Sequence, residues 1–402
     1  MNVTENNHLI PKDAASLARD IYAVQDEFLV KAFLNKPLFS PKGREKKTMS
    51  AEVGSRLINT KDGFGVCALG AEQEKVGNQD TSNRHAIIVF RGSTTANMYA
   101  DWISNFRIGV ETSSTGLPVH IGFNSIFMSM KDQIEKFLNQ HNNKIKYVHC
   151  VGHSLGGAIA TITSDWIKCN YSTKEVKLYT FGAPKPGFEW FARKLTTRLN
   201  SESVHRVFHS TDPVPMIPLY PFVHAPIPGT GTHLYSSEAL LSADAHDMRL
   251  YFDSVKDPEA SWSSLGDPLP STSYDKLVEK WLASDGSVNP FNPKTWEWIN
   301  AGLEYVIKKI LKVTAISLQA GFSGCITLAD KLALILRKGI EYSAKLSIWV
   351  VRLMAKIMQA LGMKIKQKAE ELTHFVIRYV LQTLMNKIST VGKQAIKNIT
   401  KY

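Results

Sequence analysis

One stretch decides the fold of this chain: Val148-His149-Cys150-Val151-Gly152-His153-Ser154-Leu155-Gly156-Gly157-Ala158. It begins as an apolar run, turns at a serine with glycines two residues to either side, and continues into a helix-like run. The pattern predicts a strand, a sharp turn and a helix, because a strained backbone at the serine leaves room only for glycine at those flanking positions. Such a turn brings the hydroxyl of Ser154 to a helix N-terminus, where a developing oxyanion is stabilised. An inert serine in a glycine-rich turn would show the same pattern, so residues elsewhere must support any chemistry.

Strands and helices alternate on both sides of this stretch. The apolar runs predict strands at 63–70, 85–90, 145–151, 176–181 and 204–208. Helical spacing of apolar residues predicts helices at 13–33, 124–138, 158–168 and 189–199, whereas the polar, lysine-rich segment 36–55 predicts an exposed loop. The alternation is typical of a mostly parallel α/β sheet, whose ligands bind at the carboxyl ends of the strands.

A serine nucleophile requires a general base that is oriented by a carboxylate. The first carboxylate placed just beyond a strand after Ser154 is Asp212, in the sequence Asp212-Pro213-Val214-Pro215. Aspartate before proline is also a common start of a turn. Its place at the carboxyl edge of the predicted sheet favours Asp212 as the orienting acid.

Four histidines after the serine are candidates for the base. His209 is too close to Asp212 in the chain to stand on a separate loop, while His224 and His233 lie in an apolar, proline-rich loop that predicts a wall of an acyl pocket. His246 stands at the start of a helix-like run after the last core strand, which is where such a base belongs. We therefore predict His246 as the base and keep His233 as the alternative.

A short amphipathic helix is predicted at 97–106, directly after the turn at Ser93. Its large apolar residues recur at intervals of three to four. A surface helix docked on the core would show the same pattern, but the position after the turn favours a lid over a pocket. The predicted lid and substrate-binding residues are Met98, Tyr99, Trp102 and Ile103.

Five motifs together resemble the lipase class 3 (fungal lipase-like) family in their order and spacing. They are Phe90-Arg91-Gly92-Ser93, Val119-His120-Ile121-Gly122-Phe123, Gly152-His153-Ser154-Leu155-Gly156-Gly157-Ala158, Thr180-Phe181-Gly182-Ala183-Pro184 and Asp212-Pro213-Val214-Pro215. The resemblance covers roughly residues 60–260. It implies an α/β-hydrolase fold and a serine lipid acyl-ester hydrolase that works through an acyl-enzyme.

The resemblance also implies roles for individual residues. Ser154 would be the nucleophile, Asp212 the orienting acid and His246 the base, with an oxyanion hole built from Ser93 and the backbone N–H of Leu155. The sequence departs from the family pattern near the base: members often show Asp-His-x-x-Tyr, whereas here Asp247 follows His246 and Tyr251 comes five residues after it.

Cysteine spacing and the N-terminus bear on cofactors and export. The four cysteines are widely spaced with no C-x-x-C pair, so neither a disulfide framework nor a zinc site is expected, and the predicted chemistry requires no metal or cofactor. The polar segment 1–11 lacks the charged and apolar regions of a Sec-type signal peptide. We expect a protein that is cytoplasmic as synthesised, with secretion by a signal-independent system and action at a membrane left open.

Charge divides the chain into unlike parts. Residues 1–289 hold 30 Lys and Arg against 30 Asp and Glu, whereas residues 290–402 hold 18 against 6, so the last part carries the whole net charge of +12. We predict an α/β-hydrolase-like catalytic domain over 1–257, a linker with short helical pieces over 258–290, and an all-α, basic amphipathic region over 291–402. Such asymmetry indicates an anionic partner.

The predicted helical region has a polar stripe and an apolar face. The stripe repeats every seven residues along one long helix, at Lys338, Lys345, Arg352, Gln359 and Lys366. The apolar face is supplied by Ile340, Trp349, Leu353, Ile357, Leu361, Leu372, Val376 and Ile388. A bundle packed on itself or on the catalytic domain would use this face, and so would a helix lying on an anionic membrane surface. The longest charge-free run, 313–329, is short and polar for a membrane-spanning helix.

The leading functional hypothesis is a phospholipase A-type enzyme or lipase that acts on phospholipid or another long-chain acyl ester. The missing signal, the basic helical region and the resemblance suggest a membrane-targeting antibacterial toxin with an immunity or delivery protein as partner. One alternative is a membrane-disrupting or partner-binding helical protein with an accessory hydrolase domain. Another is a triacylglycerol or monoacylglycerol lipase of lipid catabolism. Nucleic acid is not an expected partner, since no recognisable module is present.

Overall fold

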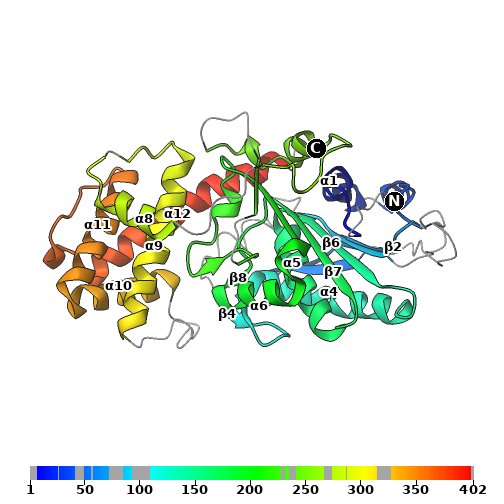
Figure 1. The fold of residues 1–402 in the computed structure, drawn as a ribbon, viewed down its shortest axis with the longest axis horizontal. Coiled ribbons are helices and arrows are strands. Elements are labelled where there is room, and N and C mark those ends of the chain that lie inside the picture. The colour runs from blue at the N-terminus through cyan, green and yellow to red at the C-terminus, as the bar shows by residue number, and fades with distance from the viewer. Residues whose placement is uncertain are drawn as a thin grey trace.

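A computed structural model of the protein describes residues 7–25, 27–40, 49–55, 58–71, 85–92, 109–227, 231–234, 241–266, 274–286, 288–314 and 327–399. Its α/β part is built around a seven-stranded sheet with the spatial order β1-β2-β3-β6-β7-β9-β11. In Figure 1 this sheet lies to the right of the helices from α8 (Tyr274–Ala283) to α11 (Ala344–Ala360). The strands are β1 (Met49–Ser55), β2 (Ile58–Leu69), β3 (His85–Phe90), β6 (Tyr147–His153), β7 (Glu175–Phe181), β9 (Val204–His209) and β11 (Thr232–Leu234).

The sheet is mostly parallel, as predicted. Pairing from β3 through β6, β7 and β9 to β11 is parallel, and β1 and β2 add two antiparallel strands beside β3. Residues 49–55 form the edge strand β1, so the predicted loop over 36–55 is wrong for this part. An edge strand does not need the continuous apolar pattern that identifies a buried parallel strand, which is why the residue pattern does not predict β1.

Helices cover both faces of the sheet. α4 (Ile121–Gln140), α5 (Leu155–Asn170) and α6 (Glu189–Leu199) lie on one face, and α1 (Pro11–Asp20) and α7 (Met248–Val255) on the other. Successive side chains of a strand point to opposite faces of the sheet. Ile88 of β3 therefore packs into the core beneath α4, α5 and α6, whereas Ile87 packs into the core beneath α1 and α7. The chain therefore has the layered α/β-hydrolase architecture, with a small antiparallel sheet of β4 (Val110–Thr112), β5 (Pro118–His120), β8 (Gly187–Phe188) and β10 (Phe222–Val223) at its side.

The N-terminal helix predicted at 13–33 is broken into separate elements. α1 is followed by the 3₁₀ turn η1 (Ile21–Gln25) and by α2 (Glu27–Leu34). Pro11 rather than Asp13 begins α1, in the first helical position where its missing N–H costs nothing. The turn places Ile21 and Val24 in the core and directs the hydroxyl of Tyr22 towards β6.

The last part of the chain is all α-helical. Its helices are α8 (Tyr274–Ala283), α9 (Pro293–Thr314), α10 (Leu328–Tyr342), α11 (Ala344–Ala360) and α12 (His374–Ile399), with the short 3₁₀ turn η6 (Ala369–Glu371). The single long helix predicted over 338–366 is wrong, because Ser343 adopts an extended conformation and caps α11 through the N–H of Leu346. The seven-residue polar stripe is therefore spread over several elements.

The predicted apolar face of this region is largely used in packing. Leu353, Leu372 and Ile388 are buried, and Ile340 and Trp349 are partly buried against the same core. That core is continuous with the one beneath α4, α5 and α6, so the helical region and the sheet share one hydrophobic interior. Among the described residues, no helix combines the length and the hydropathy of a membrane span.

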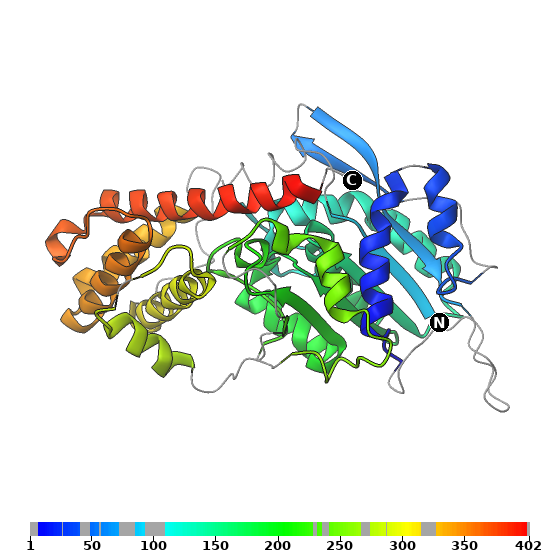
Figure 2. The same ribbon diagram turned by 90° about the horizontal axis from the view of Figure 1, so that it is seen from above.

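α12 links the two parts of the molecule. It packs on α10 and α11, and it also contacts the 3₁₀ turns η4 (Val214–Met216) and η5 (Asp244–His246) of the α/β part. Figure 2 shows this helix running from the helical region back over the α/β part. The turns that it reaches carry the predicted acid and base, or lie next to them.

Candidate active site

Ser154 stands at a strained turn between β6 and α5. Its φ of 56° and ψ of −133° lie in a region that residues with a side chain rarely adopt. The chain can make this turn because Gly152 and Gly156 flank it: a Cβ at Gly152 would lie 2.2 Å from the carbonyl oxygen of Gly156, and one at Gly156 would lie 2.3 Å from that of Phe90. The turn therefore has the geometry of a nucleophile elbow.

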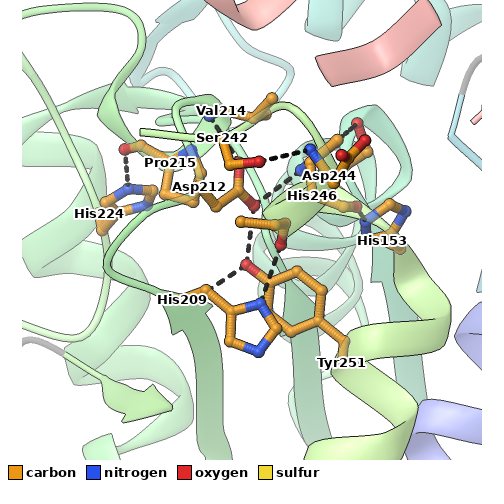
Figure 3. A network of polar contacts seen from close by, with 12 residues as sticks. His153, His209, Asp212, Val214, Pro215, His224, Ser242, Asp244, His246 and Tyr251 are labelled. Carbon is orange, nitrogen blue, oxygen red and sulfur yellow. Dashed lines mark hydrogen bonds and ion pairs between the residues drawn. The ribbon is translucent and has the colours of Figure 1, made fainter. Parts of the chain in front are cut away.

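His246 joins this serine to Asp212. The Nε2 atom of His246 lies 2.8 Å from the Oγ of Ser154, and its Nδ1 atom lies 2.7 Å from the Oδ2 of Asp212. Because Asp212 accepts the proton on Nδ1, Nε2 is left as the acceptor for the serine hydroxyl. All three side chains are at most 1% exposed. The three residues therefore form a continuous hydrogen-bonded series, part of which is drawn in Figure 3.

The carboxylate of Asp212 is held by three donors. Its Oδ1 accepts the N–H of Val214 at 2.8 Å, and its Oδ2 accepts the hydroxyl of Tyr251 at 2.7 Å in addition to His246 (Figure 3). Burial and the nearby charge of Asp212 hold the pKa of Tyr251 well above its usual value, so this phenol stays a donor. The hydroxyl in turn accepts the N–H of His209 at 3.0 Å. Tyr251, five residues after the base, thus fixes the position of the acid.

His153, directly before the serine, supports the backbone of the base. Its Nε2–H donates to the carbonyl oxygen of His246 at 2.9 Å, so its Nδ1 is the acceptor for the hydroxyl of Tyr22 at 2.7 Å. Burial and the neighbouring His246 lower the pKa of His153 well below its usual value, which keeps the ring neutral. Nothing in the sequence pattern predicts this role of His153, although the residue lies inside the motif around Ser154.

The segment after Asp212, residues 213–217, is held at its carbonyl groups. His224 Nε2–H donates to Pro215 at 2.8 Å, and Lys185 donates from Nζ to Met216 at 2.9 Å and from its backbone N–H to Ile217 at 2.8 Å. Burial lowers the pKa of Lys185 to about 7. His224, which the sequence predicts at the wall of an acyl pocket, makes a contact that fixes the segment after Asp212.

The other predicted site residues fall into two groups. Leu155 is the first residue of α5 and follows Ser154 directly, and the first amides of a helix have no carbonyl partner within it. His233 lies on β11 with its ring centroid 5.4 Å from that of Phe208, and the hydrogen bonds to Ser154 and Asp212 come from His246 instead. The remaining predicted residues lie outside the described residues: Ser93, Met98, Tyr99, Trp102 and Ile103. Within the described ranges, no three His, Cys, Asp or Glu side chains gather as ligands for a metal ion.

Comparison with known proteins points to one family. The family described as Lipase (class 3) matches residues 87–222. A secreted mono- and diacylglycerol lipase of Fusarium solani is 30% identical over 174 residues, which are 42% of this chain and 47% of that protein. Toxin TseL of Vibrio cholerae is 39% identical over 103 residues, 26% of this chain and 15% of the toxin.

The chain is also similar to a phospholipase and to a lipase of known structure. The chloroplastic phospholipase A(1) DAD1 of Arabidopsis thaliana is 28% identical over 174 residues, 38% of this chain and 37% of that protein. The triacylglyceride lipase of Rhizomucor miehei, a solved structure, aligns with a TM-score of 0.39 at 20% identity over 57% of this chain and 78% of its own. The chain spans less than half the length of each of these three curated relatives.

Proposed function

Residues 87–222 belong to the class 3 lipase family, and from that premise we propose that this chain hydrolyses lipid acyl esters with Ser154 as the nucleophile. The observation that carries the proposal is the hydrogen-bonded series from Ser154 through His246 to Asp212. The serine lies on a strained turn at a helix N-terminus, and the acid and the base come from two other loops at the same sheet edge. This combination of a nucleophile, a base and an orienting carboxylate suits acyl transfer.

The reaction follows from the positions of these atoms. Ser154 Oγ attacks the ester carbonyl while His246 Nε2 takes its proton, and Asp212 stabilises the imidazolium that forms. The backbone N–H of Leu155, and Ser93 by resemblance, would stabilise the oxyanion, a contribution typically of about 3–4 kcal/mol per donor. His246 then protonates the leaving alcohol, and water resolves the acyl-enzyme by the reverse proton transfers. Because Ser154 is buried, we infer that the surrounding chain must move to admit an acyl chain.

The substrate that we propose is a phospholipid presented at an anionic surface. The basic helical region supports this choice over a neutral glyceride, and the apolar loop at 214–234 supports a long acyl chain over a small soluble ester. The names of the relatives, which include a mono- and diacylglycerol lipase and a phospholipase A(1), leave both lipid classes as candidates.

We propose that the helical region contacts that surface through residues that its own packing leaves exposed. Phe375 and Tyr379, on successive turns of α12, are 70% and 57% exposed, and Arg378, which forms an ion pair with Asp330 of α10, lies between them in the sequence. Lys364 and Lys368 are exposed in the segment that leads into α12. Exposed aromatic rings beside basic side chains suit the boundary between lipid headgroups and acyl chains, where the rings insert and the cations meet anionic lipid.

We also propose that the protein is a toxin directed at bacterial membranes and that an immunity protein restrains it. It is supported by the similarity to Toxin TseL over 103 residues and by the basic helical region. Directing the protein to the bacterial periplasm tests it. Growth arrest by the wild type but not by Ser154→Ala would support an enzymatic toxin, and normal growth with active protein present would contradict it.

Fatty-acid release by purified wild type and Ser154→Ala tests the enzymatic activity. It is measured on anionic phospholipid vesicles and on diacylglycerol emulsions. Fatty-acid release by the wild type alone supports the proposal, and the preferred lipid identifies the substrate class. Equal release by both proteins would rule out Ser154 as the nucleophile. Vesicle leakage without fatty-acid release, equal in both proteins, would instead favour a membrane-disrupting helical region with an accessory hydrolase domain.

A further inference from the structure

The segment that carries the predicted acid is tied to the helical region by a specific polar junction. We call residues 212–217 the acid turn. The carbonyl groups at its end accept hydrogen bonds from Lys185, which follows β7, at Met216 and Ile217. Lys185 is only 6% exposed, so the position of its ammonium group depends on protein partners rather than on water.

This ammonium group also donates to a residue of α9. Lys185 Nζ donates to the Oδ1 of Asn300 at 3.2 Å, and the same oxygen accepts the backbone N–H of Tyr220 at 3.1 Å. Tyr220 lies in the segment that continues from the acid turn towards β10. One amide oxygen of the helical region therefore binds both Lys185, which holds the end of the acid turn, and the backbone of Tyr220, which lies just beyond that turn.

A second contact from the helical region reaches the same turn. α12 packs on η4 and η5, and a Cβ at its Gly392 would lie 3.3 Å from the Cδ1 of Ile217. The acid turn is thus covered by α12 on one side and bound through Lys185 to α9 on another. The helical region supports the turn from which Asp212 reaches His246.

We propose that Asn300 is a positioning residue for the hydrolysis, holding Lys185 and Tyr220 so that the acid turn keeps Asp212 within hydrogen-bonding distance of His246. Asn300 lies outside the segment that matches the lipase family, 87–222. The helical region is then part of the active-site scaffold as well as a surface-binding element. This inference rests on the function proposed above.

The test compares Asn300→Leu, which keeps the volume but removes the acceptor, with Asn300→Asp, which keeps an acceptor oxygen. Because a small displacement of a catalytic group is costly, we expect Asn300→Leu to lower kcat on a soluble short-chain ester roughly 10- to 100-fold with little change in KM. Asn300→Asp should retain kcat to within about threefold, since a carboxylate oxygen can accept from the same donors. Asn300→Ala serves as a second variant if the leucine variant does not fold.

Ser284→Ala is a matched control. Ser284 accepts a hydrogen bond at 3.2 Å from Lys356, a lysine of the helical region that is also 6% exposed, so the change likewise removes one acceptor from a buried ammonium group. Its kcat should equal that of the wild type. A fall in kcat for Asn300→Leu no larger than that for Ser284→Ala, or no rescue by Asn300→Asp, would overturn the inference.

A spectroscopic readout separates this inference from the proposed function. The proton on Nδ1 of His246, bound by Asp212, should give a low-field ¹H resonance in the wild type and in Ser284→Ala. It should weaken or shift in Asn300→Leu even if the protein hydrolyses none of the esters tested. An unchanged resonance in a folded Asn300→Leu protein would contradict the positioning role, whatever the activity of the wild type.

Discussion

The ring of His153 donates a hydrogen bond from Nε2 to the carbonyl oxygen of His246, 2.9 Å away. The residue before Ser154 therefore fixes the backbone of His246, the residue that we propose as the base. The hydroxyl of Tyr22, from the N-terminal part of the chain, completes the arrangement by donating to Nδ1 of the same ring. The positions of Ser154 and His246 are thus coupled through a single buried imidazole.

Replacing His153 by leucine tests this coupling. The change removes the donor to the carbonyl of His246, and we expect kcat to fall about tenfold, equivalent to about 1.4 kcal/mol, with KM nearly unchanged. Steady-state kinetics on a short-chain ester measure the effect. Tyr22→Phe should reproduce a smaller part of it, whereas Tyr171→Phe, which removes an exposed hydroxyl bonded to Asn139, is the control. Wild-type kcat in a folded His153→Leu protein would refute the coupling.

Tyr251 is expected to orient Asp212 rather than take part in proton transfer. Tyr251→Phe removes a donor to the carboxylate and an acceptor for the N–H of His209, so we expect a loss of roughly 1–3 kcal/mol in the free energy of unfolding. Its kcat should fall far less than that of Asp212→Asn, for which about a 10⁴-fold fall is typical of a triad carboxylate replaced by its amide. Urea unfolding and kinetics on both variants give the comparison. Equal losses of kcat would contradict it.

A group of histidines on the face of the sheet covered by the N-terminal segment predicts acid sensitivity. His8 and His205 lie 2.6 Å apart between ring nitrogens, and His149 lies 3.1 Å from the hydroxyl of Tyr179. Burial, reinforced by neighbouring positive groups, lowers the pKa of His8 to about 4 and those of His149 and His205 well below 6.5. The unfolded chain binds these protons more readily than the folded chain does. The contribution of these histidines to the free energy of unfolding is therefore fully present above pH 6.5 and is lost as the pH falls towards the folded pKa values.

His149→Gln tests this origin of acid sensitivity. The variant retains hydrogen-bonding groups but cannot titrate, so the slope of unfolding free energy against pH between pH 6 and 4.5 should fall by up to roughly 1.4 kcal/mol per pH unit. Urea unfolding at a series of pH values measures the slope. An unchanged slope would show that other groups take up the protons on unfolding.

Binding to anionic vesicles should depend on the exposed aromatic residues of α12. Phe375→Ser with Tyr379→Ser should weaken binding roughly tenfold, because two rings that would otherwise leave water are lost. Cosedimentation with vesicles measures this. Trp190→Ser with Phe291→Ser, which also removes two exposed aromatic rings, should bind as the wild type does. Equal weakening in both pairs would indicate nonspecific adhesion.

The sequence predicted most of what lies close to the serine. The glycine spacing around Ser154 has a local steric cause, and the order of strands places Asp212 and His246 at the same edge of a parallel sheet. The hydrogen bonds of the structure join these same three residues.

The supporting contacts could not be predicted, because each depends on the packing of distant segments. Tyr22 and His153 are 131 residues apart, and Lys185 and Asn300 are 115 apart, with no pattern in the sequence that links them. The break at Ser343 was missed because serine within a helical pattern becomes a cap only where the chain turns.

The proposed function requires that Ser154 forms the acyl-enzyme and that His246 activates it. Treatment with a fluorophosphonate, followed by peptide mass spectrometry, tests it most directly. We expect one phosphonyl adduct, on the peptide that carries Ser154, and almost no adduct in a folded His246→Ala protein although the serine is still present. An adduct at another residue, or equal labelling of the wild type and His246→Ala, would contradict these roles of Ser154 and His246.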